Sequence, residues 1–378
     1  MKLYLEKLID HGGFSRVYVA RITSSFSDLK GPVVVKKAHV TKHVRYPALQ
    51  HEASALLLLE GHPSTPAVYA WGRSQYYEYL AVEQLGQELG CVLEAPGGLT
   101  MRNLVVLACQ MLDAVEHVHA HGLIHCDIKP SNFLFTLDGS RLKLIDFGLA
   151  RSWRDSTTGL HIGQGSIPFL LGTVHYASIP VHRHHTPSRR DDVESLAYTI
   201  VKLLRGKLPW REDKPEDVLR TKLAWSGAAL CAGYPPVFAD LVDYARALPF
   251  KEAPDYARWR RDLRALVSEG LSDDALYEPE HNGEPKVGKP GVEDAKPLER
   301  VTEADVSKPL SEDDEDSLPD SDDNWFPTSS WPPPHIIKNV DLIGDEEGLV
   351  KARLERIEEP PAMEHPWLEP NLVEVMDA

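Results

Sequence analysis

A helical segment, a glycine, a polar loop and a short apolar strand follow one another between residues 101 and 148. Apolar residues recur at helical spacing over residues 101–121, and Gly122 ends the pattern as a C-terminal cap does. The loop H-C-D-I-K-P-S-N occupies residues 125–132, and the strand of residues 142–145 leads into D-F-G. The chain must therefore pass from a helix to a strand through a loop crowded with charged and amide side chains.

This loop and the strand after it carry the residue types that phosphoryl transfer needs, which are groups for positioning and charge compensation. Asp127 is suited to orient an incoming hydroxyl and take its proton, and Lys129 to offset the charge of the transferred group. Asn132 and Asp146 offer the hard oxygen ligands that Mg²⁺ prefers. The joint pattern is typical of protein kinases and predicts ATP and Mg²⁺ as cofactors.

The first 85 residues predict a strand-rich region with one helix. Two alternating segments around a Gly-Gly turn predict a hairpin, and two short apolar runs predict further strands. The ranges are 4–9 and 17–22 for the hairpin, 33–35 and 79–82 for the other strands, and 48–59 for the helix.

Lys36 ends the strand V-V-V-K. A lysine at such a position holds the phosphates of ATP and is steadied by a glutamate on the next helix. We assign this role to Glu52, with Glu60, near the end of that helix, as the reserve. Neighbouring residues of a strand point to opposite faces, so Lys36 and Lys37 cannot both serve. We assign Lys36 because it shares the face of Val34.

The hairpin turn matches a glycine-rich phosphate loop only in part. The pattern G-x-G-x-x-G-x-V falls on Asp10, Gly12, Ser15 and Val17, and Gly13 adds a second flexible residue. We assign Gly12, Gly13 and Val17 to nucleotide binding. Asp10 beside a triphosphate is unfavourable, and weakened ATP binding is expected.

Charge divides the chain near residue 270. The formal net charge is −16, but residues 271–378 hold 29 Asp and Glu against 9 Lys and Arg, which leaves residues 1–270 mildly basic. We predict that residues 271–324 are disordered, because acidic and Pro-rich segments with few aliphatics cannot bury a core. Residues 340–359 predict one amphipathic helix, on the positions of Leu342, Leu349, Val350, Leu354 and Ile357.

Composition also excludes several classes of protein. The four cysteines are widely spaced without a C-x-x-C pair, which argues against a disulfide framework or a zinc site and favours the cytoplasm or nucleus. No signal peptide and no apolar run long enough to span a bilayer are evident, so no membrane partner is expected. The acidic tail speaks against nucleic acid as a partner. A monomer is the default expectation.

Several motifs of residues 170–260 resemble the casein kinase 1 family of serine/threonine protein kinases. They are G-T-V-H-Y-A-S-I at 172–179, S-R-R-D-D-V-E-S-L at 188–196, L-P-W at 208–210, G-Y-P-P-x-F at 233–238 and P-D-Y at 254–256. The resemblance covers residues 4–268. It implies an α+β, bilobal protein kinase fold, with a small β-rich N-lobe with one helix at 1–85 and a larger, mainly helical C-lobe at 86–270. The acidic, largely disordered tail expected at 271–378 follows from composition and charge.

The resemblance also implies how the site is built. It implies ATP in the cleft, with adenine on backbone groups near Glu83 and Leu85 and with Val82 as gatekeeper. It implies that Asp192 anchors the catalytic loop and that Thr173 lies beside Asp127 and Lys129. It implies protein substrates with acidic or phosphorylated residues near the target serine or threonine.

Three residues depart from the family or general kinase pattern. Cys126 replaces the arginine that usually meets an activation-loop phosphate, so phosphorylation there is not the expected switch. His175 replaces an arginine of the family's anion pocket, which predicts a weaker preference for phosphorylated substrates. Ser15 replaces the last glycine of the phosphate loop.

The acidic run S-E-D-D-E-D-S-L-P-D-S-D-D at residues 311–323 suggests regulation. Ser317 follows five acidic residues and is the best self-substrate in the chain. We expect the tail to fold back, occupy the substrate groove and inhibit, with residues 325–334 as an anchor. The basic residues expected to face it are Arg189, Arg190, Arg220 and Lys222.

Two other functions stay open from sequence. A pseudokinase or scaffold with little turnover fits the degenerate glycine loop, although Lys36, Asp127, Asn132 and Asp146 are all intact. A small-molecule phosphotransferase shares the H-x-D-x-x-x-x-N loop, but such enzymes generally lack Lys129 and the glycine of D-F-G.

Overall fold

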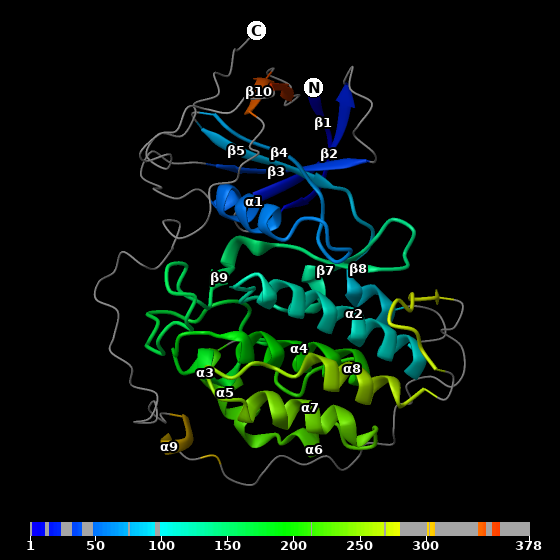
Figure 1. The fold of residues 1–378 in the computed structure, drawn as a ribbon, viewed down its shortest axis with the longest axis vertical. Helices are drawn as coiled ribbons and strands as arrows, with labels where there is room; N and C mark the ends of the chain where they lie inside the picture. Colours follow the sequence, from blue (N-terminus) through cyan, green and yellow to red (C-terminus); the bar gives the residue numbers. More distant parts are fainter. Residues whose placement is uncertain are drawn as a thin grey trace. The chain divides into compact units, whose positions relative to one another are not determined.

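The structure, a computed structural model, falls into two compact units that are described separately (Figure 1). Unit 1 contains Met1–Leu85, Asp146–Gly148 and Trp325–Ala378, and unit 2 contains Gly86–Ile145 and Leu149–Asn324. The residues described are 2–11, 15–23, 32–39, 48–74, 76–94, 99–212, 214–267, 270–279, 301, 303–306, 339–344 and 350–355.

Unit 1 is built on an antiparallel sheet of strand order β10-β11-β1-β2-β3-β5-β4. The hairpin expected at the N-terminus is present as the β1–β2 pair, and β3 and β5 are the two other expected strands. Strand β4 was not expected, because its small and aromatic residues do not alternate clearly. The bounds are β1 Lys2–His11, β2 Ser15–Thr23, β3 Val33–His39, β4 Val68–Arg73, β5 Tyr77–Glu83, β10 Asn339–Gly344 and β11 Val350–Glu355.

The prediction of a helix over residues 340–359 is wrong. Strands β10 and β11 pair with each other there, and β11 pairs with β1 through the register Leu3↔Ala352. Val340 and Leu342 alternate, as do Val350 and Leu354 around Ala352, which suits strands. Gly344 and Gly348 between these runs disfavour a continuous helix.

The expected helix of unit 1 is α1 (Ala48–Leu58), which packs on β3, β4 and β5 and buries Leu49, Ala53 and Leu56 (Figure 1). Its first turn holds no acidic residue of its own. Glu78 of β5 supplies one, because its Oε2 accepts a hydrogen bond from the Leu49 amide at 3.2 Å. A carboxylate from the sheet thus caps the helix start, where backbone N–H groups lack partners.

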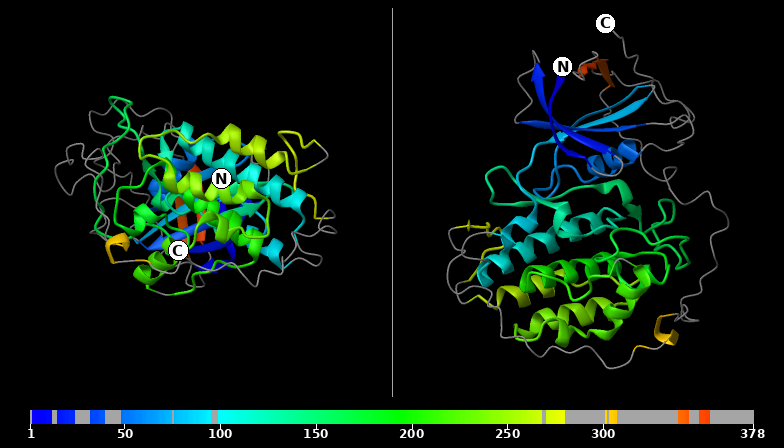
Figure 2. Two further views of the ribbon diagram at one scale, coloured as in Figure 1. Left: turned by 90° about the horizontal axis from the view of Figure 1, so that it is seen from below. Right: turned by 180° about the vertical axis from the view of Figure 1, so that it is seen from behind.

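Unit 2 is mainly helical (Figure 2), and the first half of helix α2 (Met101–Ala120) is buried on all sides, because every residue from Asn103 to Cys109 is buried. It packs against α4 (Arg189–Arg205) and α8 (Tyr256–Arg264), and α4 packs in turn on α7 (Pro236–Ala247). The shorter helices are α3 Ile179–His182, α5 Pro215–Ala224, α6 Gly227–Leu230 and α9 Glu303–Val306. The short strands are β6 Leu123–Ile124, β7 Phe133–Phe135, β8 Leu142–Leu144 and β9 Arg151–Ser152.

Helix α4 begins earlier than its hydrophobic pattern alone suggests. Ser188 and Asp191 form a capping box, in which the Ser188 amide donates to Asp191 Oδ2 at 2.7 Å. The helix therefore starts at Arg189, whereas the sequence pattern alone predicts a helix over residues 192–205. This cap fixes the first turn of α4, which carries Asp192.

Several sequence predictions fall outside the described residues. They concern Gly12, Gly13, the disorder of most of residues 271–324, Ser317 and the aromatic segment 325–334. Among the helices in the described ranges, none has the length and apolar character to cross a membrane.

The environment of Glu78 generates a stability prediction. This side chain is 1% exposed, its Oε1 has no hydrogen-bond partner within the described part of the chain, and burial raises the pKa of the carboxyl to about 7. The raised pKa means that folding favours the protonated form. Stability linked to Glu78 is therefore present at low pH and lost as the pH rises from about 4.5 to about 7.

Glu78→Gln keeps an acceptor for the Leu49 amide but cannot ionise. We expect its free energy of unfolding, relative to the wild type, to increase by roughly 2–3 kcal/mol between pH 5 and pH 8. Urea unfolding of both proteins at several pH values measures this difference. A difference that stays constant with pH would show that Glu78 does not titrate in this window.

Candidate active site

Unit 1 brings Lys36 and Glu52 together. Lys36 Nζ lies 2.5 Å from Glu52 Oε1, and both side chains are largely buried. Burial alone would lower the pKa of Lys36, but the nearby carboxylates of Glu52 and Asp146 outweigh it and the net shift of this pKa is upward. The amine is therefore held charged and oriented, as a group that contacts phosphates must be.

The two neighbouring lysines of β3 take opposite faces. Lys36 is paired across the sheet with Val17 on β2 and Leu80 on β5, and Val17 is paired with Asp10 on β1. Lys37 Nζ instead lies 4.0 Å from the centroid of the Tyr77 ring. Val17 and Lys36 thus share one face of the sheet, which is the arrangement assigned to nucleotide binding.

The residues assigned to adenine are Glu83, the last residue of β5, and Leu85, which follows the strand. Val82 is buried, and the Glu83 amide donates to the Ala67 carbonyl while Glu83 Oε2 accepts from the Ala67 amide. The next residues leave the sheet, and Leu85 is half-buried. Glu83 is therefore held by its neighbours, and its role toward adenine stays a prediction.

Unit 2 brings Asp127, Lys129, Asn132 and Thr173 into one hydrogen-bonded cluster. Lys129 Nζ donates to Asp127 Oδ2 at 2.7 Å and to Thr173 Oγ1 at 2.9 Å, and Thr173 Oγ1 donates to Asp127 Oδ1 at 2.7 Å. Asn132 Nδ2 donates to the Asp127 carbonyl at 2.8 Å. These contacts leave Asn132 Oδ1 as the amide atom that would serve a metal.

The carboxylate of Asp127 is kept ionised by this cluster. Burial would raise its pKa, but Lys129 and the hydrogen bond from Thr173 outweigh burial and hold the pKa below its usual value. The group is thus an oriented hydrogen-bond acceptor at neutral pH. It is placed to align a hydroxyl rather than to act as a strong base in isolation.

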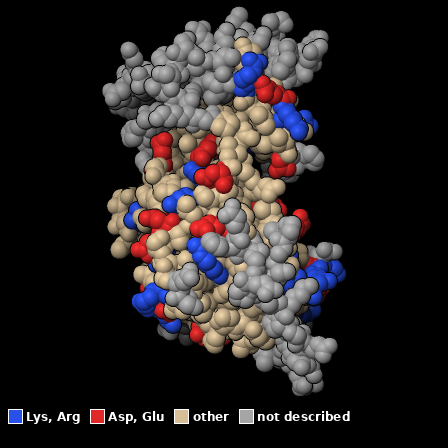
Figure 3. All heavy atoms as spheres, turned by 90° about the vertical axis from the view of Figure 1, so that its right-hand side faces the viewer, with Lys and Arg blue, Asp and Glu red and all other residues tan. Residues whose placement is uncertain are grey.

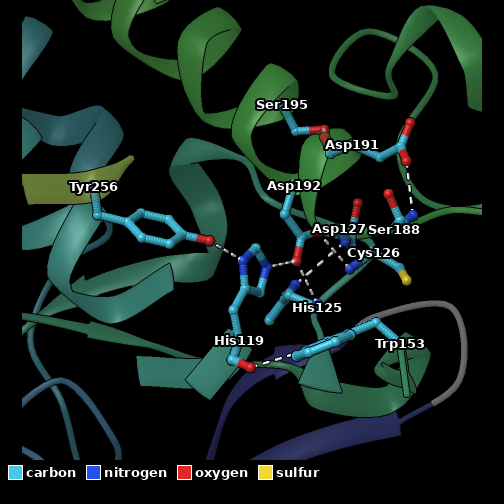
Figure 4. Close-up of polar contacts among 10 residues, drawn as sticks. All are labelled: His119, His125, Cys126, Asp127, Trp153, Ser188, Asp191, Asp192, Ser195 and Tyr256. Carbon is cyan, nitrogen blue, oxygen red and sulfur yellow. Dashed lines mark hydrogen bonds and ion pairs between the residues drawn. The ribbon is translucent and has the colours of Figure 1, made fainter. Parts of the chain in front are cut away.

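Asp192 of α4 holds the loop that carries Asp127 (Figure 4). Its Oδ2 accepts from the His125 amide at 2.6 Å, and its Oδ1 accepts from the Cys126 amide at 2.9 Å. Cys126 has a φ of 66°, a left-handed conformation that costs energy for a non-glycine residue. Asp192 offsets this cost and fixes the direction in which the loop presents Asp127.

A buried polar chain supports Asp192 from behind. His119 Nε2 lies 2.9 Å from Asp192 Oδ2, and its Nδ1 contacts the hydroxyl of Tyr256 (Figure 4). Burial lowers the pKa of His119, so this imidazole is neutral at physiological pH. Tyr256 belongs to the P-D-Y motif, which explains why that motif matters for a loop far away in sequence.

Gly172 is a site residue that the sequence marked only as part of a motif. Its φ is +82°, and a Cβ atom there would lie 2.4 Å from the Cys126 carbonyl oxygen and 3.3 Å from Asp127 Oδ1. The backbone of the segment 172–179 can approach the catalytic loop this closely only without a side chain. This approach places Thr173 against Asp127.

The basic residues expected to face an anionic partner are mostly used otherwise. Lys222 is fully buried, so its assignment to an anion-facing surface is wrong. Arg189 stacks over the Trp153 ring at 3.9 Å and donates to the Lys251 carbonyl, and Arg190 donates to the Leu248 carbonyl. On the face of unit 2 in Figure 3, basic and acidic side chains are interspersed.

A metal site would depend on few protein ligands. In the described ranges, no group of three or more His, Cys, Asp or Glu residues is arranged to hold a metal ion. Asp146 has a φ of 66°, a conformation that aspartate tolerates better than most residues. The carboxylate of Asp146, in unit 1, and the amide oxygen of Asn132, in unit 2, are each hard oxygen donors of the kind that Mg²⁺ prefers.

Gly172→Ala tests the close approach of the substrate-side segment to the catalytic loop. Residues with Cβ pay about 1–2 kcal/mol for a left-handed conformation, and here the methyl group would also collide with Cys126 O. We expect turnover to fall at least tenfold, which is the size of effect that a small displacement of a catalytic group produces. Gly139→Ala is the matched control, because its φ is +75° but nothing lies within 4 Å of the added Cβ. Equal turnover of the two variants would contradict the steric argument.

One family model matches this chain. This is the model of the protein kinase domain family, and it matches residues 4–229, which is more than half of the chain. The matched part includes Lys36, Glu52, Asp127, Asn132 and Asp146. The β-sheet unit and the helical unit are those of this family, and the chain belongs to the protein kinase domain family.

Proposed function

We propose that this kinase is an active serine/threonine protein kinase of the casein kinase 1 type that uses ATP and Mg²⁺. The observation that carries the proposal is the cluster in which Lys129 and Thr173 both bind the carboxylate of Asp127. A chain that had lost turnover would have no need to keep this carboxylate ionised, oriented and paired with a lysine. The casein kinase 1 assignment rests on the motifs of residues 172–256.

In the proposed reaction, Asp127 aligns the acceptor hydroxyl and takes its proton as the bond from that oxygen to the γ-phosphorus of ATP forms and the bond from the γ-phosphorus to ADP, the leaving group, breaks. Lys129, already held beside Asp127, offsets the negative charge of the phosphoryl group as it moves. Lys36, charged and fixed by Glu52, binds phosphate oxygens. Mg²⁺ would neutralise phosphate charge when it is bound together with ATP, and Asp146 and Asn132 are the residues that would hold it.

The proposed substrates are proteins with acidic or phosphorylated residues near the target serine or threonine. Lys222 is not available to bind such residues, because it is buried. His175 is half-buried, and its carbonyl accepts from Trp210 Nε1 at 2.8 Å. Comparing serine, threonine and tyrosine peptides, each with and without an upstream acidic or phosphorylated residue, tests both acceptor type and context.

Mutations of the two charged clusters test the chemistry. Asp127→Asn is expected to lower turnover by roughly 10²–10⁴-fold, the usual scale for a positioned acid–base group. Lys36→Met is expected to abolish turnover, whereas Lys37→Met should not, because Lys37 lies on the opposite face against Tyr77. Phosphate transfer from labelled ATP to a peptide measures all three. Wild-type turnover in the Lys36 and Asp127 variants would place the chemistry elsewhere.

The two alternatives give different outcomes in the same assay. A pseudokinase would bind nucleotide without transferring phosphate to any peptide. A small-molecule phosphotransferase would transfer phosphate to a small alcohol but not to peptides, and the match to the protein kinase domain family counts against it. The four free cysteines support the proposal of a cytoplasmic or nuclear location, and we propose a monomer.

Tail-mediated autoinhibition is a further part of the proposal. Helix α9 of the tail packs against α5, and Arg183 donates to the Asp305 carbonyl. This contact gives the tail an attachment on unit 2 that was not expected from sequence, which named residues 325–334. The stretch from Val306 to Ser317 can span on the order of 35 Å when extended, so an anchored α9 raises the effective concentration of Ser317 near the loop of residues 172–179.

A variant of residues 312–316 in which each Glu is changed to Gln and each Asp to Asn tests this inhibition. It removes the negative charge of these residues but keeps strands β10 and β11. Peptide phosphorylation should rise at low salt, and the gain should shrink at higher salt, because the Debye length falls from about 10 Å at 0.1 M to about 3 Å at 1 M. Equal activity of both proteins at low salt, with no phosphate on Ser317 after incubation with ATP, would refute inhibition by the tail.

A further inference from the structure

We propose that Lys222 is a positioning residue for the catalytic base, acting from α5 through the backbone of the segment 172–179 and the side chain of Thr173. The inference rests on the proposed function, because it assigns a part in that reaction to a residue that contacts neither substrate nor nucleotide. It replaces the role first expected for Lys222, which was to face anions at the surface.

The amine of Lys222 is inserted into unit 2 and surrounded by acceptors. Its side chain is fully buried, and Nζ lies 3.0 Å from the Val174 carbonyl, 2.5 Å from the Ala177 carbonyl and 3.0 Å from His182 Nε2. The rings of Tyr198 and Trp210 flank it, with centroids 5.0 and 5.4 Å from Nζ. Two of its three polar partners are therefore backbone atoms of a single short segment.

The same segment is tied down at neighbouring positions by α4 and by Trp210. Ser178 Oγ donates to Asp191 Oδ1 at 2.5 Å, and the Ile179 amide donates to Glu194 Oε1 at 2.8 Å. Trp210 Nε1 donates to the His175 carbonyl at 2.8 Å. Lys222 supplies the contacts at Val174 and Ala177, and Val174 directly follows the residue that contacts the base.

Thr173 links this anchored segment to the chemistry. Its hydroxyl donates to Asp127 Oδ1 and accepts from Lys129 Nζ, so the position of the Thr173 backbone determines the hydroxyl geometry around Asp127. Within the segment, the Tyr176 and Ala177 amides donate to the Thr173 carbonyl. A tight turn thus joins the carbonyls that Lys222 holds to the residue that orients the base.

A buried lysine is a costly way to fill space, which favours a specific role. Burial lowers the pKa of Lys222, as expected for an amine removed from water. An apolar side chain of the same length would fill the volume without that cost but would leave the Val174 and Ala177 carbonyls without this donor. His182 Nε2 lies 3.0 Å from the Val174 carbonyl oxygen as well as from Lys222 Nζ, and its tautomer decides whether it donates to the carbonyl or accepts from the amine, so Lys222 is the donor that reaches both the Val174 and the Ala177 carbonyls.

The test compares Lys222→Met with Lys202→Met in the full-length protein. Lys202 also donates to a backbone carbonyl, that of Gly206 in the cap of its own helix, and it is the matched control. We expect Lys222→Met to lower kcat for a peptide on the order of 10²-fold while Mg–ADP affinity, measured with a fluorescent nucleotide, changes less than about twofold. Lys202→Met should match the wild type in both.

A double-mutant cycle with Thr173→Val separates positioning from general destabilisation. If Lys222 acts through Thr173, removing Lys222 in the Thr173→Val background should change kcat by less than about twofold. Independent effects that multiply would overturn the inference, as would an unchanged kcat in Lys222→Met. An inactive wild type would instead refute the proposed function.

Lys222→Gln, which keeps one donor, is the second variant if the methionine variant does not fold. If both variants fold, we expect the kcat of Lys222→Gln to lie between those of the wild type and Lys222→Met. If only Lys222→Gln folds, we expect its kcat to be below that of the wild type and its Mg–ADP affinity to be unchanged. Failure of both variants to fold would assign Lys222 to stability alone and overturn the positioning role.

Discussion

The buried carboxylate of Asp192 is the contact on which the rest of the site depends. It accepts hydrogen bonds from two consecutive backbone amides, those of His125 and Cys126, and so holds a loop whose own conformation is unfavourable at Cys126. Asp192 is held in turn by His119 and by the capped first turn of α4. The direction of Asp127 is thus set by an element more than sixty residues away in sequence.

Residues whose roles follow from their order along the chain were predictable from the sequence. The loop of residues 125–132 and the strand that follows it present their polar groups in a fixed order, and strand alternation separates Lys36 from Lys37. The structure places these residues in the expected pairs, with Lys36 on Glu52 and Lys129 on Asp127. Their catalytic roles stay predictions.

Residues whose role depends on packing were not predictable in this way. A lysine in a helix of mixed charge looks like a surface group, and only the fold shows that Lys222 turns inward to backbone carbonyls. Glu78 likewise lies just before the apolar run of residues 79–82, and its burial at the start of α1 follows from the contact between helix and sheet. The prediction of a helix over residues 340–359 was wrong for a related reason. The apolar positions there fit the spacing of a helix as well as that of strands, and the pairing of β11 with β1 decides for strands.

The left-handed backbone at Cys126 also bears on how the protein folds. The left-handed conformation of Cys126 is stabilised by the hydrogen bond from its amide to Asp192, and this bond can form only after α4 has docked against α2. The catalytic loop is therefore expected to become ordered late in folding. Contacts absent from the folding transition state act mainly on the unfolding rate. The loop that does the chemistry would then influence how long the native state persists more than how fast it forms.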